Sequence, residues 1–209
     1  MTEAGRRPGP AAVWVVTGPI GGGKSAATAV LAELGATVID ADAVGHDVLR
    51  RPEVIAALTD AFGDGILHGG EVDRPALGRL AFADPASLAA LDRITHPPLA
   101  SELARRVASA PAGGLAVVEA AVYFRLPPFG PVDLVIAVTA PEALRRHRLV
   151  ASGRLDADAA ARRIRAQRPL LKDWEGSDIV LRNDGDLDAL RGAVRALHAR
   201  HHPTPDRTT

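Results

Sequence analysis

A stretch of eight residues near the N-terminus has the residue types and spacing of a phosphate-binding loop. Residues 18–25 read GPIGGGKS, which fits the pattern G-x-x-x-x-G-K-[ST]. Glycines let backbone N–H groups turn toward a phosphate, and a helix that begins at the lysine adds unpaired N–H groups and a positive dipole end. In this pattern Lys24 contacts the β- and γ-phosphates of a nucleotide, and the Ser25 hydroxyl is a ligand of Mg²⁺. The alternative is a structural strand-to-helix turn, which the register of Lys24 and Ser25 disfavours.

Acidic side chains follow two other apolar runs. If residues 38–42 stay extended, Asp40 and Asp42 point to the same side, toward the crevice where parallel α/β sheets bind ligands. A carboxylate there could accept a proton from an attacking hydroxyl. Alternatively, Asp40 caps the next helix. Glu119 could hold Mg²⁺ directly or through water, with structural capping as the alternative. We interpret His46 as a packing or polar contact.

Five apolar runs read as the strands that position these residues. They lie at residues 13–17, 37–40, 115–120, 134–138 and 178–182. Continuous apolar runs without alternation are typical of strands covered on both faces. Because helix-like stretches lie between them, the sequence predicts an α/β fold with a five-stranded parallel sheet flanked by helices.

Two helices of this core can be delimited from the sequence. One is expected at 24–34, ended by Gly35, and the other at 186–200, with Asp186 as its N-cap. The second helix carries an apolar stripe made of Leu187, Leu190, Val194 and Leu197. Three nearby histidines are interpreted as part of a solvated tail and not as a metal site: His198, His201 and His202.

A helical insertion is predicted over 48–112, within a single domain whose core comprises about 13–47, 113–140 and 176–200. Its amphipathic pieces lie at 53–62, 76–82, 87–94 and 99–109. Prolines are expected to mark helix starts and turns at 52, 75, 85, 97, 98 and 111.

A second polar helical interval, 141–173, is either a solvated helical face or a mobile lid that faces phosphates. It carries eight of the arginines: Arg145, Arg146, Arg148, Arg154, Arg162, Arg163, Arg165 and Arg168. The polar ends, 1–10 and 203–209, are expected to be disordered.

Composition narrows the class of protein. The 25 basic and 25 acidic side chains cancel, which disfavours nucleic acid and membrane surfaces as partners and favours small molecules. The chain has no cysteine, which excludes disulfides and thiolate metal sites and favours the cytoplasm. No apolar stretch reaches the ~20 residues of a membrane span, and no signal peptide is evident. We therefore expect a soluble, unexported protein, either a monomer or a small homo-oligomer.

In combination, the motifs resemble the dephospho-coenzyme A kinase family, a relative of the nucleoside monophosphate kinases. The matching pieces, in the family's order, are TGPIGGGKS, LGATVIDAD, GGEVDRPALGRLAFADPASLAALDRITHPPL, VVEAAVYF, RIRAQRPLL and DIVLRNDGDLDAL. They cover nearly the whole chain, whereas a phosphate loop alone indicates only nucleotide binding. The resemblance implies a P-loop kinase that uses ATP and Mg²⁺ to phosphorylate the ribose 3′-hydroxyl of dephospho-CoA, the last step of coenzyme A biosynthesis.

The resemblance also implies residue roles. Asp42 would be the catalytic base and Lys24 the second catalytic residue, while the insertion would bind the acceptor and 141–173 would be the lid over ATP. For His96 the residues alone favour a buried histidine between helices, and the resemblance reverses this preference. The implied acceptor-binding residues are Asp42, Asp73, Arg74, Arg79 and His96. The implied nucleotide-binding residues are Gly18, Gly21, Gly22, Gly23, Lys24, Ser25, Ala26, Arg148 and Asn183, the last opening a segment to Gly185 that borders the adenine.

The sequence departs from the family pattern at several positions. Ala26 lacks a hydroxyl that can contact the α-phosphate, which predicts weaker ATP binding. The usual lid arginine is replaced by Ser152, so that Arg154 or Arg148 would take its role. The remaining departures are Pro19, Gly22, Ala121 and Arg125. Three rivals stay open: another small-molecule or nucleotide kinase, a non-catalytic nucleotide-binding relative, and a motor or switch ATPase.

Overall fold

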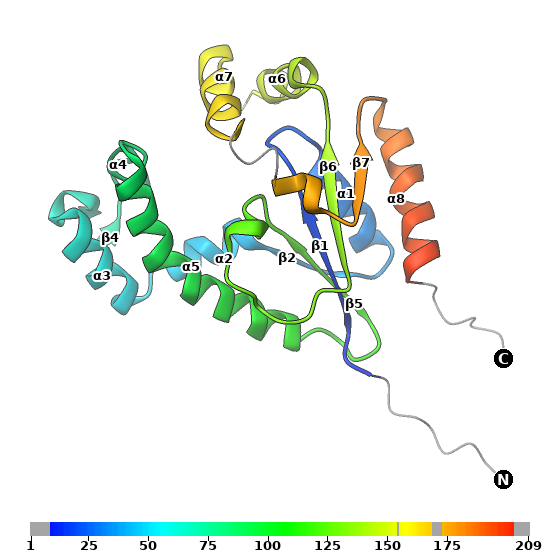
Figure 1. Cartoon of the computed structure of the whole chain (residues 1–209), viewed down its shortest axis with the longest axis horizontal. Helices are drawn as coiled ribbons and strands as arrows, with labels where there is room; N and C mark the ends of the chain where they lie inside the picture. The colour runs from blue at the N-terminus through cyan, green and yellow to red at the C-terminus, as the bar shows by residue number, and fades with distance from the viewer. Residues whose placement is uncertain (1–8, 154, 169–172, 203–209) are drawn as a thin grey trace, which may run out of the picture. The chain divides into compact units, whose positions relative to one another are not determined.

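Five apolar strands form a parallel sheet, shown in Figure 1. The structure is a computed structural model and describes residues 9–153, 155–168 and 173–202. The strands are β1 (Ala12–Thr17), β2 (Thr37–Asp40), β5 (Leu115–Glu119), β6 (Leu134–Thr139) and β7 (Ile179–Arg182). Their order is β2-β5-β1-β6-β7; β1 pairs in parallel with β5 and β6, and β6 pairs in parallel with β7. The five predicted strands are confirmed, each to within one residue at either end.

Two helices, α1 (Lys24–Glu33) and α8 (Leu187–His201), pack on this sheet and on each other. Their common core consists of Trp14, Val16, Ala27, Val30, Leu31, Leu115, Val117, Leu134, Ile136, Val138, Leu190, Val194 and Leu197. Burial of one large side chain of this kind stabilises the fold by about 1.5–3 kcal/mol. The predicted stripe is wrong only at its first member, because Leu187 is 57% exposed and the buried stripe begins one turn later.

The C-terminal helix is longer than predicted and buries one of its histidines. Asp186 is the N-cap, as expected, and its carboxylate accepts the N–H of Ala189 at 2.8 Å. The interpretation of the histidines as part of a solvated tail is wrong for His198, which lies within α8 and is only 6% exposed, whereas His201 is exposed. His198 lies on the buried stripe because it follows Val194 by four residues. Its ring meets that of Trp14 edge to face, with the centroids 6.1 Å apart.

The chain divides into two units, and the second unit is mainly helical. The first comprises Met1–Ile39, Val107–Arg125 and Pro131–Thr209, and the second comprises Asp40–Arg106 and Leu126–Gly130. The elements between β2 and β5 are α2 (Ala41–Val48), α3 (Pro52–Phe62), the 3₁₀ turn η1 (Asp64–Ile66), β3 (Leu67–His68), β4 (Glu71–Val72), α4 (Arg74–Ala81) and α5 (Pro85–Ala108). The second unit thus includes α2, which the sequence analysis grouped with the sheet.

The helical interval differs from expectation in two respects. Two of the predicted helices are one, since α5 continues through Pro97 and Pro98. The two missing N–H groups remove hydrogen bonds from the helix, and the buried side chains of Leu99 and Leu103 offset this loss. The antiparallel β3–β4 hairpin was not expected, because strands of two residues show no periodicity.

The arginine-rich interval also folds into helices. It contains α6 (Glu142–Ala151) and α7 (Ala157–Ala166), and the 3₁₀ turn η4 (Asp173–Gly176) begins at its last residue. The 3₁₀ turn η2 (Tyr123–Arg125) lies between β5 and β6. Arg154 lies outside the described residues, as do most of the two expected tails. Among the helices that the structure describes, none combines the length and apolar character needed to cross a bilayer.

His198 predicts an acid-sensitive contribution to stability. Burial lowers the pKa of His198, and a charge on His202 lowers it further. A histidine whose pKa is lower in the folded than in the unfolded state makes its full contribution to stability above the unfolded pKa, about 6.5. This contribution is lost as the pH falls, because protons bind the unfolded state more tightly. We expect His198→Leu to lose less stability than the wild type between about pH 7.5 and about pH 5.5.

Urea unfolding midpoints at the two pH values measure this difference. His68→Gln is the matched control, because His68 is exposed on β3. An equal loss of stability in the wild type and in His198→Leu would contradict the lowered pKa of His198.

Candidate functional site

The phosphate loop, residues 18–25, connects the end of β1 to the start of α1. Gly18, Gly21 and Gly23 have φ values of 127°, 73° and 110°, in the region that favours glycine. A side chain on Gly23 would also collide with the amide of Asn183. Gly23 caps α1 without a side chain, so the first N–H groups of the helix have no side-chain acceptor from the cap. The loop therefore has the backbone geometry of an anion site.

Lys24 lies back across the loop. Its Nζ donates to the carbonyl oxygens of Gly18 at 3.1 Å and Pro19 at 3.4 Å. The ammonium group is thereby held on the loop that would receive phosphates. Next to it, Ala26 packs against the buried core.

Ser25 and Glu119 meet in the first unit, although they are far apart in sequence. Ser25 Oγ donates to Glu119 Oε1 at 2.9 Å, and Thr28 Oγ1 donates to Glu119 Oε2 at 2.8 Å. Hydroxyl and carboxylate oxygens are the ligands that Mg²⁺ prefers, and it is usually bound by one or two protein groups together with substrate phosphates. Within the described ranges no cluster of three or more His, Asp or Glu side chains could hold a metal alone. The Ser25–Glu119 pair fits a magnesium ion that also binds phosphate oxygens.

Asn183 joins the loop after β7 to the phosphate loop. The residue is 6% exposed, and its Nδ2 donates to the Gly22 carbonyl at 2.9 Å. Arg148 of α6 donates to both the carbonyl oxygen and Oδ1 of Asn183, at 3.0 and 3.3 Å. The structure therefore brings together Asn183, Arg148 and the phosphate loop, three parts of the expected nucleotide site.

A hollow of about 290 Å³, here called the β6–β7 cavity, lies where these two strands end. It is lined by Thr139, Ala140, Pro141, Val180, Arg182 and Asp184. Parallel sheets bind ligands beyond the carboxyl ends of their strands. The cavity thus offers a place for a group attached to the bound phosphates.

Gln167 and Arg145 fix the helices after β6 to the phosphate loop; the sequence singled out only Arg145, as one of eight arginines in the interval 141–173. Gln167 Oε1 accepts the N–H of Ile20 at 2.7 Å. Arg145 is 5% exposed; its Nη1 donates to the carbonyl of Ile20 in the loop at 3.5 Å, and its Nε donates to the carbonyl of Ala140 at 3.1 Å. Burial lowers the pKa of Arg145. From the sequence, Arg145 belonged either to a solvated face or to a lid, because a run of charges gives no sign of which member is buried.

The second unit contains a larger hollow of about 480 Å³, here called the α2–α5 cavity. It is lined by Ala41, Asp42, Gly45, His46, Val48, Leu49, Arg74, Leu77, Gly78, Phe82, Leu91, Asp92, Thr95, His96 and Leu99. Three expected acceptor residues, Asp42, Arg74 and His96, therefore share one cavity. Arg79 is exposed in the last turn of α4 and is not among the described residues that line it. Asp73 caps α4 by accepting the N–H of Ala76.

The expectation that residues 38–42 stay extended is wrong. The strand ends at Asp40, whose carboxylate accepts the N–H groups of Asp42 and Ala43 at 2.8 and 3.3 Å and so caps α2. Asp42 is consequently a residue of the first helical turn, exposed at the cavity. The capping alternative for Asp40 is confirmed. An Asp at this position can end the strand and start a helix, because its side chain accepts hydrogen bonds from the free N–H groups of the first helical turn.

The cavity also contains an acid–imidazole pair. His96 Nε2 and Asp92 Oδ1 are 3.3 Å apart, four residues apart on α5. His46 lines the same cavity from α2, and Phe82, at its rim, is 71% exposed. Sequence spacing could have revealed Asp92, since residues i and i+4 share a helix face, but Phe82 gave no such signal.

We expect Asn183→Asp to lower both thermal stability and ATP affinity. The substitution replaces the donor to Gly22 by an oxygen, so that a buried carbonyl loses its partner and faces a negative charge. An unsatisfied buried polar group costs about 1–3 kcal/mol. Thermal unfolding and ATP titration measure the two effects, with exposed Asp188→Asn as the control. Wild-type values for both would contradict the structural role of Asn183.

Comparisons with known proteins identify the family. A family model described as dephospho-CoA kinase matches residues 13–189. Curated dephospho-CoA kinases from Frankia casuarinae and Corynebacterium efficiens are 41% and 39% identical to this chain, covering 87% and 88% of it and 80% and 94% of their own length. The crystal structure of TT1252 from Thermus thermophilus has a TM-score of 0.77 at 31% identity, covering 94% of this chain and all of that one. A dephospho-CoA kinase from Campylobacter jejuni shares the fold, with a TM-score of 0.57 at 20% identity over 92% of this chain and 98% of its own. These matches agree with the presence of a phosphate loop and of the cavity that contains Asp42. The chain therefore belongs to the dephospho-CoA kinase family.

Proposed function

We propose that the protein transfers the γ-phosphoryl group of ATP to the ribose 3′-hydroxyl of dephospho-CoA, giving coenzyme A and ADP. A phosphate loop would serve any kinase of this fold. The observation that carries the proposal is the α2–α5 cavity, because it combines a carboxylate, an arginine and an acid–imidazole pair beside an apolar wall. Family membership supports the same acceptor.

On the donor side, we infer that the phosphate loop holds the phosphates of ATP. Backbone N–H groups and the start of α1 would bind the β-phosphate, and Lys24 would leave the Gly18 and Pro19 carbonyls for phosphate oxygens. The β6–β7 cavity beside Asn183 would receive the adenine. The Arg148 guanidinium, which now bonds the Asn183 segment, would hold that segment against the base.

Ser25 and Glu119 would hold the magnesium ion, Glu119 directly or through water. Bound there, the ion would supply charge neutralisation for the β- and γ-phosphate oxygens. The hydrogen bond between the two side chains brings their oxygens together before any ion binds. This arrangement supports a magnesium site whose ligands come partly from the protein and partly from the nucleotide.

On the acceptor side, we infer that Asp42 orients the 3′-hydroxyl and accepts its proton. Its position in the first turn of α2 leaves the carboxylate exposed at the cavity, where a hydroxyl can reach it. Arg74 and His96 would bind the charged and polar parts of dephospho-CoA, and Leu77, Phe82 and Leu91 would contact its apolar parts. Phosphoryl transfer needs little covalent help from the protein, so that positioning and charge neutralisation would supply most of the acceleration.

A coupled ADP-release assay with ATP, Mg²⁺ and dephospho-CoA tests the proposal, with NMR to locate the new phosphate. We expect ADP release to depend on dephospho-CoA and the phosphate to lie on the ribose 3′-oxygen. ADP release with shikimate or a nucleoside monophosphate instead would indicate another kinase. Binding of both ligands without coenzyme A would indicate a non-catalytic relative, and hydrolysis indifferent to dephospho-CoA would indicate an ATPase.

The role of Asp42 has a separate test. Asp42→Asn should lower kcat about 10²–10⁴-fold, the range for loss of a general base, while the Kd for ATP stays near the wild-type value. Single-turnover kinetics and ATP titration separate the two effects. Asp60→Asn, exposed on α3 of the same unit, is the matched control. A fully active Asp42→Asn enzyme would refute the assignment.

A further inference from the structure

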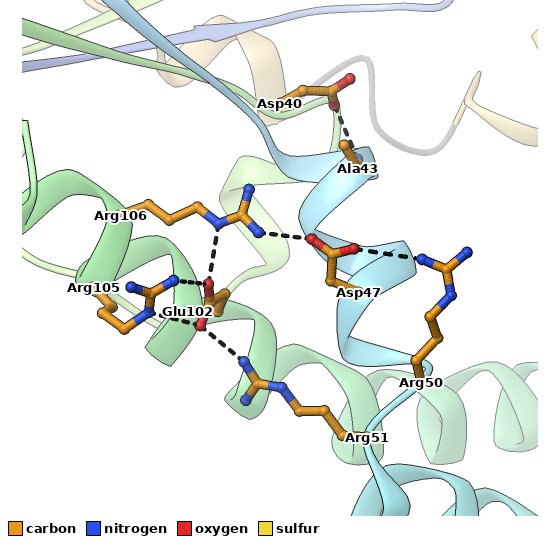
Figure 2. A network of polar contacts seen from close by, with 8 residues as sticks. All are labelled: Asp40, Ala43, Asp47, Arg50, Arg51, Glu102, Arg105 and Arg106. Carbon is orange, nitrogen blue, oxygen red and sulfur yellow. Dashed lines mark hydrogen bonds and ion pairs between the residues drawn. The ribbon is translucent and has the colours of Figure 1, made fainter.

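A cluster of charged side chains in the second unit lies outside the α2–α5 cavity. Its centre is Glu102 of α5, whose side chain is 10% exposed and accepts hydrogen bonds from three arginines (Figure 2). Arg51 Nη2 donates to Oε2 at 2.9 Å, Arg105 Nη2 to Oε1 at 2.6 Å, and Arg106 Nε to Oε1 at 3.1 Å. Such charge-assisted bonds are about twice as strong as neutral ones.

The cluster joins α5 to both helices of the α2–α3 segment. Arg106 extends beyond Glu102 and donates through Nη2 to Asp47 Oδ2 on α2, at 2.7 Å. Arg51 is the N-cap residue of α3, and its N–H donates to the carbonyl of Val48 at the end of α2. Two of the ion pairs in Figure 2, Arg51–Glu102 and Arg106–Asp47, therefore connect α5 to the α2–α3 segment.

The helix α2 needs such an anchor. It has eight residues with a glycine among them, and isolated helices shorter than about 12–15 residues are marginal in water. Its first turn is fixed by the Asp40 cap, and its last turn by Asp47 bonded to Arg106. Asp42, in the first turn, precedes Asp47 by five residues, which is about 7–8 Å along a helix. Val44 and Val48 are buried and keep α2 on the core, so loss of the second anchor would shift its last turn without detaching the helix.

The carboxylate at the centre of this cluster is held in its ionised form. Hydrogen bonds from Arg105 and then Arg106 lower the pKa of Glu102 to about 2. Removal of this carboxylate would leave three guanidinium groups close together without their common partner. The exposed pair of Asp47 with Arg106 is weaker, because solvent screens it.

We propose that Glu102, Arg106 and Asp47 are positioning residues for the phosphoryl acceptor. They hold α2, which carries Asp42 and His46, against α5, which carries Asp92 and His96. They thereby set the distance between the two polar walls of the α2–α5 cavity. This inference rests on the proposed function, because it assigns that cavity to dephospho-CoA. A cluster that merely stabilised the fold would leave the affinity of the cavity unchanged in folded protein.

The test compares Glu102→Gln and Asp47→Asn with the wild type, well below their unfolding temperatures. We expect the Kd for dephospho-CoA, measured by calorimetry without ATP, to rise about 10-fold in Glu102→Gln and about threefold in Asp47→Asn, because the Asp47–Arg106 pair is exposed and screened. We also expect kcat to fall between about 10- and 100-fold, the scale of a misplacement near 1 Å. The Kd for ATP should stay within about twofold of the wild-type value, since the phosphate loop belongs to the other unit. Asp47→Glu, which keeps the charge, should restore most of the lost affinity.

The matched control is Glu33→Gln in the first unit. Glu33 of α1 accepts from Arg191 and Arg195 of α8, at 2.7 and 3.2 Å, so it also joins two helices through arginines. This variant should lose stability without any change in the Kd for dephospho-CoA. If Glu102→Gln does not fold, the test rests on Asp47→Asn alone. Asp47 is 52% exposed, so its substitution leaves no buried charge without a partner.

The outcomes separate the two proposals. Wild-type Kd and kcat values in folded Asp47→Asn and Glu102→Gln would overturn the positioning role and leave the proposed function intact. A wild-type protein that does not bind dephospho-CoA would overturn both. An equal loss of ATP and dephospho-CoA affinity would indicate general destabilisation, and that result also contradicts the positioning role.

Discussion

Burial of β1 on both faces determines how the strands and helices of the first unit are arranged. Val13, Trp14, Val15 and Val16 are each at most 6% exposed, so strands and helices must surround them on every side. A parallel sheet with β1 in the middle meets this need, and it brings the carboxyl ends of the strands to one edge. The phosphate loop, Glu119 and the Asn183 segment follow three of these strands. Their convergence is therefore a consequence of hydrophobic burial and sheet direction.

Hydrogen bonds at that edge fix the positions of groups that the sheet only brings near one another. The sheet alone would allow Ser25 and Glu119, or Asn183 and Gly22, to lie within several ångströms of one another. Hydrogen bonds of 2.9 Å in both pairs fix them more closely. Because the Asn183 amide is buried, each of its polar atoms needs a partner. The loop backbone is thus held by side chains from segments that are distant in sequence.

The sequence predicted features that depend on local pattern. The five strands were recognisable as continuous apolar runs, and Asp186 was recognisable as a cap before a periodic helix. Asp42 was recognised through its motif, although the assumed extended backbone was wrong because Asp40 satisfies the first turn of α2. Local reasoning also failed at Pro97, where tertiary packing maintains a helix that proline weakens.

Features that depend on partners far along the chain were not predictable. Glu102 and Arg145 look like ordinary surface charges in the sequence, and nothing local shows that one meets three guanidinium groups while the other is buried. The Asn183–Gly22 hydrogen bond spans 161 positions. Neighbouring Gly23 has no room for a side chain, because the Asn183 amide occupies the space where it would lie. In evolution the glycine should therefore outlast the asparagine: a smaller residue at 183 would clear the space, but the φ of 110° at Gly23 would still strain any side chain placed there.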